Sequence, residues 1–162
     1  MVPTLIDELK KGRIIGIVID QKGKRENRLF CDFFGMPAPT SPAPAFIALK
    51  GDALVIPVSA IKEGDIYRFR FEKPIDTRTF GDDFTNIESL RDCWKSKSVQ
   101  ELSNWMQSWV SSVVRQNPEQ WLWLHSRWTR RSQMKRIIKK GLDFREFVIT
   151  QERTYLTGDS PE

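Results

Sequence analysis

The chain has 162 residues, of which 40% are hydrophobic and 29% are charged, a composition typical of one globular domain. Its cysteines and histidine are Cys31, Cys93 and His125, which excludes a disulfide framework, a four-ligand zinc site and any mechanism that needs two histidines. No apolar run approaches the roughly 18 residues of a membrane span, so we expect a soluble chain without metal or cofactor. The net charge of +5 favours an anionic partner.

The N-terminal residues predict a helix followed by a strand. Residues 3–11 combine an early proline, apolar residues on one face and a following Gly12, as in a short helix. Residues 14–19 form a continuous apolar, mostly β-branched run, which predicts a strand buried on both faces of a parallel sheet. That strand is expected to end at Asp20 and Gln21.

The middle of the chain predicts a mixed sheet. Residues 29–34 suggest a short strand, whereas the four prolines of residues 35–45 predict irregular backbone. A helix opened by one of these prolines and closed by Gly51 leads to an apolar strand at residues 53–60, so we expect a right-handed βαβ unit. Residues 67–71 alternate as the second strand of an antiparallel hairpin. The predicted fold is therefore α/β: an αβα sandwich with a mixed, partly parallel sheet.

The C-terminal half is predicted to be helical at first. Ser98 and Glu101 fit a capping box at the start of a long helix. Asn117 and Pro118 are expected to end that helix and begin another, which would place Trp121, Leu124, His125 and Trp128 on one side. Residues 150–162 predict a frayed tail.

Basic charge is concentrated near the C-terminus. Residues 120–142 contain no acid and hold seven basic residues, so the rest of the chain has a net charge of 5 − 7 = −2. Residues 132–141 place Met134, Ile137 and Ile138 on one side of a basic helix, a pattern found at anionic membrane surfaces. A solvated basic face is the alternative interpretation.

Three stretches of sequence carry a resemblance to a known family. They are GIVIDQ at residues 16–21; FFGMPAPT at residues 33–40, followed by PAFIAL at 44–49 and VIP at 55–57; and NPEQWLWLHSRW at residues 117–128. In this order and spacing they resemble the C-terminal half of the bacterial lipid A biosynthesis acyltransferases, the lauroyl and myristoyl transferases. The resemblance covers roughly residues 3–131, and the third stretch is its most specific part.

The resemblance implies a fold and an activity. The fold is the αβα sandwich of the glycerophospholipid acyltransferases, and the activity is transfer of a fatty acyl chain from acyl carrier protein to a hydroxyl of a lipid A precursor. The location implied is the cytoplasmic face of the bacterial inner membrane. On this interpretation residues 1–131 are the C-terminal half of an acyltransferase-like domain, and residues 132–162 are a basic extension with a frayed tail.

The family's catalytic motif is absent from this sequence. The family uses His-x-x-x-x-Asp/Glu, whereas His125 is followed five positions later by Arg130. We expect the family's N-terminal membrane anchor to be absent as well. We therefore expect a fragment that is inactive alone, whose partners are acyl carrier protein, the lipid A precursor and a missing N-terminal catalytic half. No catalytic residue is assigned, because a lone histidine beside tryptophans is more often a packed residue.

Asp20 and Gln21 are the first candidate substrate-binding residues. They follow the predicted buried strand, at the strand end where ligands bind in open α/β sheets. The resemblance implies that they contact the acceptor, while a loop-capping aspartate is the alternative.

Two further groups are candidates for substrate binding. An apolar wall that either holds an acyl chain or packs in the core would consist of Phe33, Phe34, Gly35 and Thr40. The phosphates of the precursor would contact Arg127, Arg130 and Arg131, since guanidinium groups bind phosphate bidentately.

A nucleic-acid-binding module is the competing function. Tryptophans among arginines are typical of single-strand binding, because bases stack on aromatic rings. Against this function, the aromatic residues follow the spacing of a helix core, and no RRM or KH signature is present.

Overall fold

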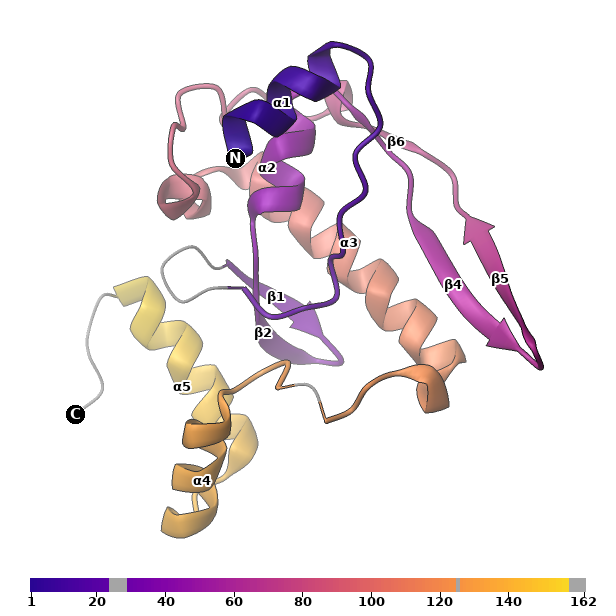
Figure 1. The fold of residues 1–162 in the computed structure, drawn as a ribbon. Helices are drawn as coiled ribbons and strands as arrows, with labels where there is room; N and C mark the ends of the chain where they lie inside the picture. The colour runs from indigo at the N-terminus through magenta and orange to yellow at the C-terminus, as the bar shows by residue number, and fades with distance from the viewer. Residues whose placement is uncertain (24–28, 125, 158–162) are drawn as a thin grey trace.

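The structure is a computed structural model that describes residues 1–23, 29–124 and 126–157, and it combines helices with small sheets (Figure 1). Its elements in chain order are α1 (Val2–Lys10), β1 (Leu29–Phe33), β2 (Met36–Thr40), α2 (Ala43–Lys50), β3 (Leu54–Val55), β4 (Val58–Glu63), β5 (Ile66–Phe71), β6 (Ile75–Asp76), η2 (Thr77–Thr79), η3 (Leu90–Lys95), α3 (Lys97–Gln116), η4 (Pro118–Gln120), α4 (Arg131–Lys140) and α5 (Phe144–Thr157). Mixed α/β structure is confirmed. In the described residues, however, β1 pairs with β2, β3 with β6 and β4 with β5, all antiparallel, so the predicted parallel βαβ unit is not formed.

The long helix α3 forms the centre of the core. It packs against β1 and α2, and its apolar buried residues recur at helical spacing: Val99, Leu102, Met106, Val110 and Val114. The Ser96 hydroxyl accepts a hydrogen bond from the Val99 amide, so Ser96 is the N-cap. The predicted capping role of Ser98 is wrong, because the Ser98 hydroxyl instead donates to the Gly81 carbonyl.

The β1–β2 hairpin lies against α3. Its two-residue turn has positive φ at both central residues, 56° at Phe34 and 74° at Gly35, as a type I′ turn requires. The strand predicted at residues 29–34 is confirmed. The irregular backbone predicted from residue 35 onward is wrong for β2. Pro37 and Pro39 are tolerated there because β1 is its only partner strand among the described residues, and the other side of β2 meets only an isolated bridge at residues 22–23.

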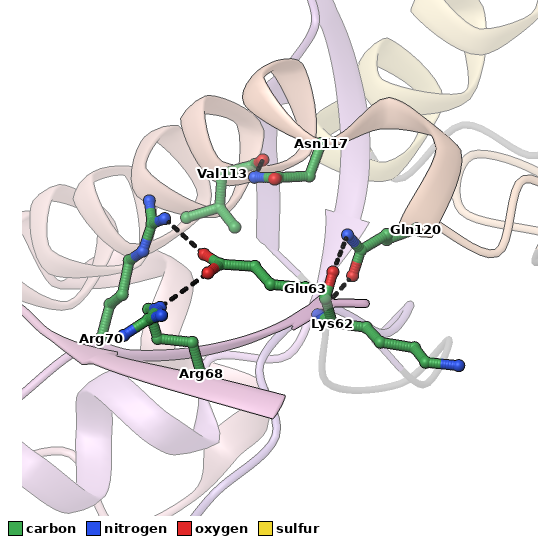
Figure 2. A network of polar contacts seen from close by, with 7 residues as sticks. All are labelled: Lys62, Glu63, Arg68, Arg70, Val113, Asn117 and Gln120. Carbon is green, nitrogen blue, oxygen red and sulfur yellow. Dashed lines mark hydrogen bonds and ion pairs between the residues drawn. The ribbon is translucent and has the colours of Figure 1, made fainter. Parts of the chain in front are cut away.

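The β4–β5 hairpin extends away from the other strands (Figure 1). It confirms the hairpin partner predicted at residues 67–71. Glu63 accepts hydrogen bonds from Arg68 at 2.7 Å and from Arg70 at 3.0 Å, which hold the pKa of the Glu63 carboxyl below its usual range (Figure 2). All six residues of β5 are exposed, so little besides β4 supports this strand.

Residues 14–19, hereafter the open segment, do not form the predicted buried strand. They follow α1 as an open trace and belong to no sheet (Figure 1). Ile14 is 99% exposed and Val18 is 74% exposed, whereas Ile19 is half-buried. The composition is that of a strand covered on both faces, but no described strand pairs with it, which is why the prediction fails here.

The structure after α3 differs most from the prediction. The short η4 comes directly after Asn117, and the extended backbone of Trp121 (φ −87°, ψ 132°) ends it. The helix predicted to continue through residue 128 is therefore wrong. Residues 150–157, predicted to fray, are the last part of α5, which packs on β2 and buries Val148 fully. His125 and residues 158–162 lie outside the described residues.

Candidate functional site

Asp20 lies at the end of the open segment, on the wall of a trough. The trough has a volume of about 580 Å³ and lies between the open segment, β4 and the C-terminal half of α3. Asp20 is half-buried, and its Oδ1 atom is buried without a hydrogen-bond partner among the described atoms. A buried carboxylate oxygen without a donor is an unmet hydrogen-bond acceptor at the edge of the trough.

A chain of buried hydrogen bonds holds the backbone just before Asp20. The Gln107 side chain donates through Nε2 to the Ile19 carbonyl at 2.7 Å and accepts through Oε1 from Arg127 Nη2 at 2.8 Å. Arg127 also donates to the Pro39 carbonyl at 2.6 Å and to Thr40 Oγ1 at 2.8 Å. The network thereby connects the open segment, α3, β2 and the residue Arg127.

Arg127 is fully buried, and its hydrogen bonds within the described residues go to uncharged acceptors. Its guanidinium carbon lies 5.0 Å from the centre of the Phe33 ring, a cation–π contact. Burial lowers the pKa of Arg127 to about 10, and the nearby Cys31 and Asp20 oppose that shift. Since its Nη groups are already bonded to the protein, Arg127 does not present them to a phosphate.

The predicted apolar wall divides into buried and partly exposed residues. Phe33 is fully buried among Phe34, Trp121 and Trp128, with ring centres 4.9, 5.7 and 5.5 Å away. Thr40 is buried as well and donates to the Ala38 carbonyl. Neither residue lines the trough, and neither do Phe34 and Gly35, which form the hairpin turn.

The remaining predicted residues are exposed. Gln21 follows Asp20 on the surface, while Arg130 and Arg131 begin α4. The Arg130 backbone amide donates to Gln133 Oε1 at 2.8 Å, and Arg130 itself is exposed. The structure therefore brings Asp20 near Arg127 but does not bring Arg127, Arg130 and Arg131 onto one exposed face.

Both thiols are unsuited to nucleophilic attack. Burial raises the pKa of Cys31 to about 11 and that of Cys93 to about 12, so each is a neutral thiol near pH 7. The described residues hold no cluster of three or more His, Cys, Asp or Glu side chains that fits a metal ion. In the same part of the chain, no helix has both the length and the apolar character to cross a bilayer.

Sequence reasoning missed two side chains that support Asp20. Gln107 lies on the buried face of α3, and a glutamine at a core position of an amphipathic helix was the available signal. Lys22 donates to the Thr129 carbonyl at 3.0 Å, a contact between residues 107 positions apart that no local pattern indicates.

Comparison with protein families gives a match over most of the chain. A search of the curated proteins finds no relative of this chain. The family model described as bacterial lipid A biosynthesis acyltransferase matches residues 2–130, which is most of the chain and includes Asp20, Gln107 and Arg127. The chain therefore belongs to the bacterial lipid A biosynthesis acyltransferase family.

Proposed function

We propose that this chain supplies the acceptor-binding part of an acyltransferase that moves a fatty acyl chain from acyl carrier protein to a hydroxyl of a lipid A precursor. The reaction would take place at the cytoplasmic face of the bacterial inner membrane. The family match over residues 2–130 supports the reaction class. The observation that carries the residue assignment is Asp20, whose unpaired carboxylate oxygen lies beside an apolar trough.

The proposed reaction needs a general base. The acceptor hydroxyl oxygen bonds to the thioester carbonyl carbon, the carbon–sulfur bond breaks, and the carrier's thiol leaves while the base takes the hydroxyl proton. The sequence contains no His-x-x-x-x-Asp/Glu motif. We therefore propose that an N-terminal catalytic half supplies the base and that this chain does not turn over alone.

Asp20 orients the acceptor in this proposal. Its carboxylate accepts a hydrogen bond from a sugar hydroxyl or amide of the precursor, and Gln21 beside it offers both a donor and an acceptor. The Gln107–Arg127 network fixes the backbone at Ile19 and thereby the position of Asp20. The exposed Arg130 and Arg131 of α4 attract the precursor's phosphates.

Vesicle co-sedimentation tests this proposal. One vesicle contains phosphatidylethanolamine with a tetra-acylated lipid A precursor, and the other contains phosphatidylethanolamine with phosphatidylglycerol at equal surface charge. We expect the chain to prefer the first, and Asp20→Asn to reduce that preference about tenfold, a loss of roughly 1.4 kcal/mol. The matched control is Asp7→Asn on the exposed face of α1.

Two outcomes contradict the proposal. Equal retention on both vesicles means that the basic surface alone binds anionic lipid. Binding of a single-stranded oligonucleotide that weakens steeply with salt, without precursor selectivity, favours the nucleic-acid function instead. We do not expect oligonucleotide binding through Trp121 and Trp128, because their rings already pack on the buried Phe33.

A further inference from the structure

The open segment has unpaired backbone groups along its length. No backbone or side-chain hydrogen bond within the described residues involves residues 14–18. The nearest bonds are those of Arg13, whose amide donates to the Glu8 carbonyl, and of Ile19, whose carbonyl accepts from Gln107. Five uncharged residues with free N–H and C=O groups resemble an exposed sheet edge, which is a template for another strand.

The opposite wall of the trough is a second open edge. The Lys62 amide donates to Gln120 Oε1 at 2.8 Å, and Gln120 Nε2 donates to the Lys62 carbonyl at 3.0 Å, so one side chain occupies the place of a neighbouring strand (Figure 2). Backbone groups two residues apart on a strand point the same way. Those of Ala60 and Val58 therefore point to the same outer edge, where no described strand pairs with them.

The trough between these two edges is apolar. Among the described residues that line it, Asp20 and Lys62 are the charged ones. Its floor is formed by Trp109, Val110 and Val113 of α3. An uncharged β-branched segment fits both the open edges and the apolar floor, because a charged side chain placed over the α3 residues would be desolvated.

The β4–β5 hairpin adds exposed apolar surface beside the trough. Tyr67, Phe69 and Phe71 lie on one face of β5 and are 64%, 62% and 71% exposed. At about 150–250 Å² per aromatic side chain, they present roughly 300–500 Å². Together with the exposed Ile14 and Val18, this approaches the roughly 800 Å² that each partner contributes to a standard interface.

We infer that the open segment and the outer edge of β4 form a docking surface for a second polypeptide, which inserts an extended, uncharged β-strand between them. Main-chain hydrogen bonds to residues 14–18 and to Ala60 supply the pairing, as in β-strand addition. The partner's adjoining surface covers the aromatic face of β5. The strand pairs with residues 14–18 and Ala60, whereas the proposed acceptor contact is made by Asp20, beyond the end of the open segment. This inference does not depend on acyl transfer, so its failure leaves the proposed function standing.

A strand-forming peptide tests the inference. The probe is a synthetic eight-residue peptide of alternating valine and threonine, blocked at both ends. The matched control peptide carries N-methyl groups on alternate residues, which remove the hydrogen-bonding edge and retain the side chains. We expect the first peptide to slow amide hydrogen exchange about tenfold at residues 14–18 and at Ala60, while the control peptide does not.

Protein variants separate pairing from folding. Ala60→Pro removes the outward N–H of β4 without removing a bond to β5, and is expected to weaken peptide binding at least tenfold. Ala60→Val keeps the N–H and is expected to keep the binding. Protection of the α3 amides reports in each case that the chain is folded.

Three results overturn the inference. The first is an absence of peptide-dependent protection at both edges. The second is equal protection by the N-methylated peptide, which would mean that apolar contact alone is responsible. The third is protection that needs no peptide and grows with protein concentration, which would place a second copy of the chain in the trough.

Discussion

The Gln107 carboxamide accepts a hydrogen bond from the Arg127 guanidinium at 2.8 Å inside the core. The same carboxamide donates to the Ile19 carbonyl, one residue before Asp20. A residue of the NPEQWLWLHSRW stretch is thereby connected to the segment that carries Asp20, although the two are more than 100 positions apart. In this account Arg127 is a positioning residue, because both of its Nη groups are bonded to the protein.

Arg127→Met tests this positioning. The substitution removes the donor from three buried acceptors, on Pro39, Thr40 and Gln107, so we expect the free energy of unfolding to fall by about 1–3 kcal/mol. Urea unfolding followed by tryptophan fluorescence measures the change. Arg130→Met, at an exposed site, is the control and is expected to have no measurable effect. Equal midpoints for the two variants would contradict the structural role of Arg127.

Substitution by lysine is predicted to destabilise the protein at one residue of the open segment and to have little effect at its neighbour. Val18 is 74% exposed, so Val18→Lys is expected to change the free energy of unfolding by less than about 0.5 kcal/mol. Ile19 packs against both apolar clusters of the core, and Ile19→Lys is expected to cost at least about 1.5–3 kcal/mol. Thermal unfolding compares the two. If Val18→Lys is the more damaging, the segment is a buried strand after all.

Alkaline pH is predicted to destabilise the protein through Cys31. Burial raises the pKa of this thiol from 9.0 to about 11, so the folded state keeps a proton that the unfolded chain releases. The stabilisation is fully present below about pH 9 and is lost as pH rises through about 11; two pKa units correspond to roughly 3 kcal/mol.

Cys31→Ala removes this dependence and leaves the other titrating groups in place. Urea unfolding at a series of pH values from neutral to alkaline is the measurement, with the alanine variant as reference. If the free energy of unfolding depends on pH in the same way for the wild type and Cys31→Ala, Cys31 does not titrate differently in the folded and unfolded states.

Asp83 is predicted to stabilise the start of α3. Desolvation opposes its ionisation, but hydrogen bonds from Ser98, Ser96 and the Lys97 amide prevail and lower the pKa of Asp83. Asp83→Asn removes negative charge at a helix N-terminus and is expected to cost about 1 kcal/mol at neutral pH. The wild type is more stable than Asp83→Asn above the unfolded pKa near 4, and this difference in the free energy of unfolding disappears as pH falls through the lowered pKa of the folded state.

The matched control for this cap is Asp82→Asn, one residue earlier and exposed. Chemical unfolding at neutral and acidic pH compares the two variants. A loss of similar size for both would assign the effect to general charge rather than to the cap.

Local sequence signals predicted the elements that local forces determine. The α2 helix closed by Gly51 and the β4–β5 hairpin follow from proline, glycine and alternation within a few residues. The β2 strand was missed because its two prolines are tolerated only where a strand has a free edge, and the edge depends on the whole sheet.

Features that depend on contacts between residues far apart in the chain could not be predicted from the sequence. The run at residues 14–19 has the composition of a covered strand, but composition cannot show whether neighbours are present to cover it. Tertiary packing also determines where the tryptophans lie. Trp121 and Trp128 contact Phe33 from an irregular segment rather than from one helix face. Asp20 was selected from sequence, whereas the Gln107 side chain that holds its backbone was not.

Acyl transfer by this chain alone tests the central claim most directly. Folded protein, verified by circular dichroism, is supplied with acyl–acyl carrier protein and a tetra-acylated lipid A precursor. The account predicts that no acyl chain is transferred, because the sequence lacks the family's His-x-x-x-x-Asp/Glu base. Turnover that disappears in His125→Ala would contradict it and would make His125 the general base.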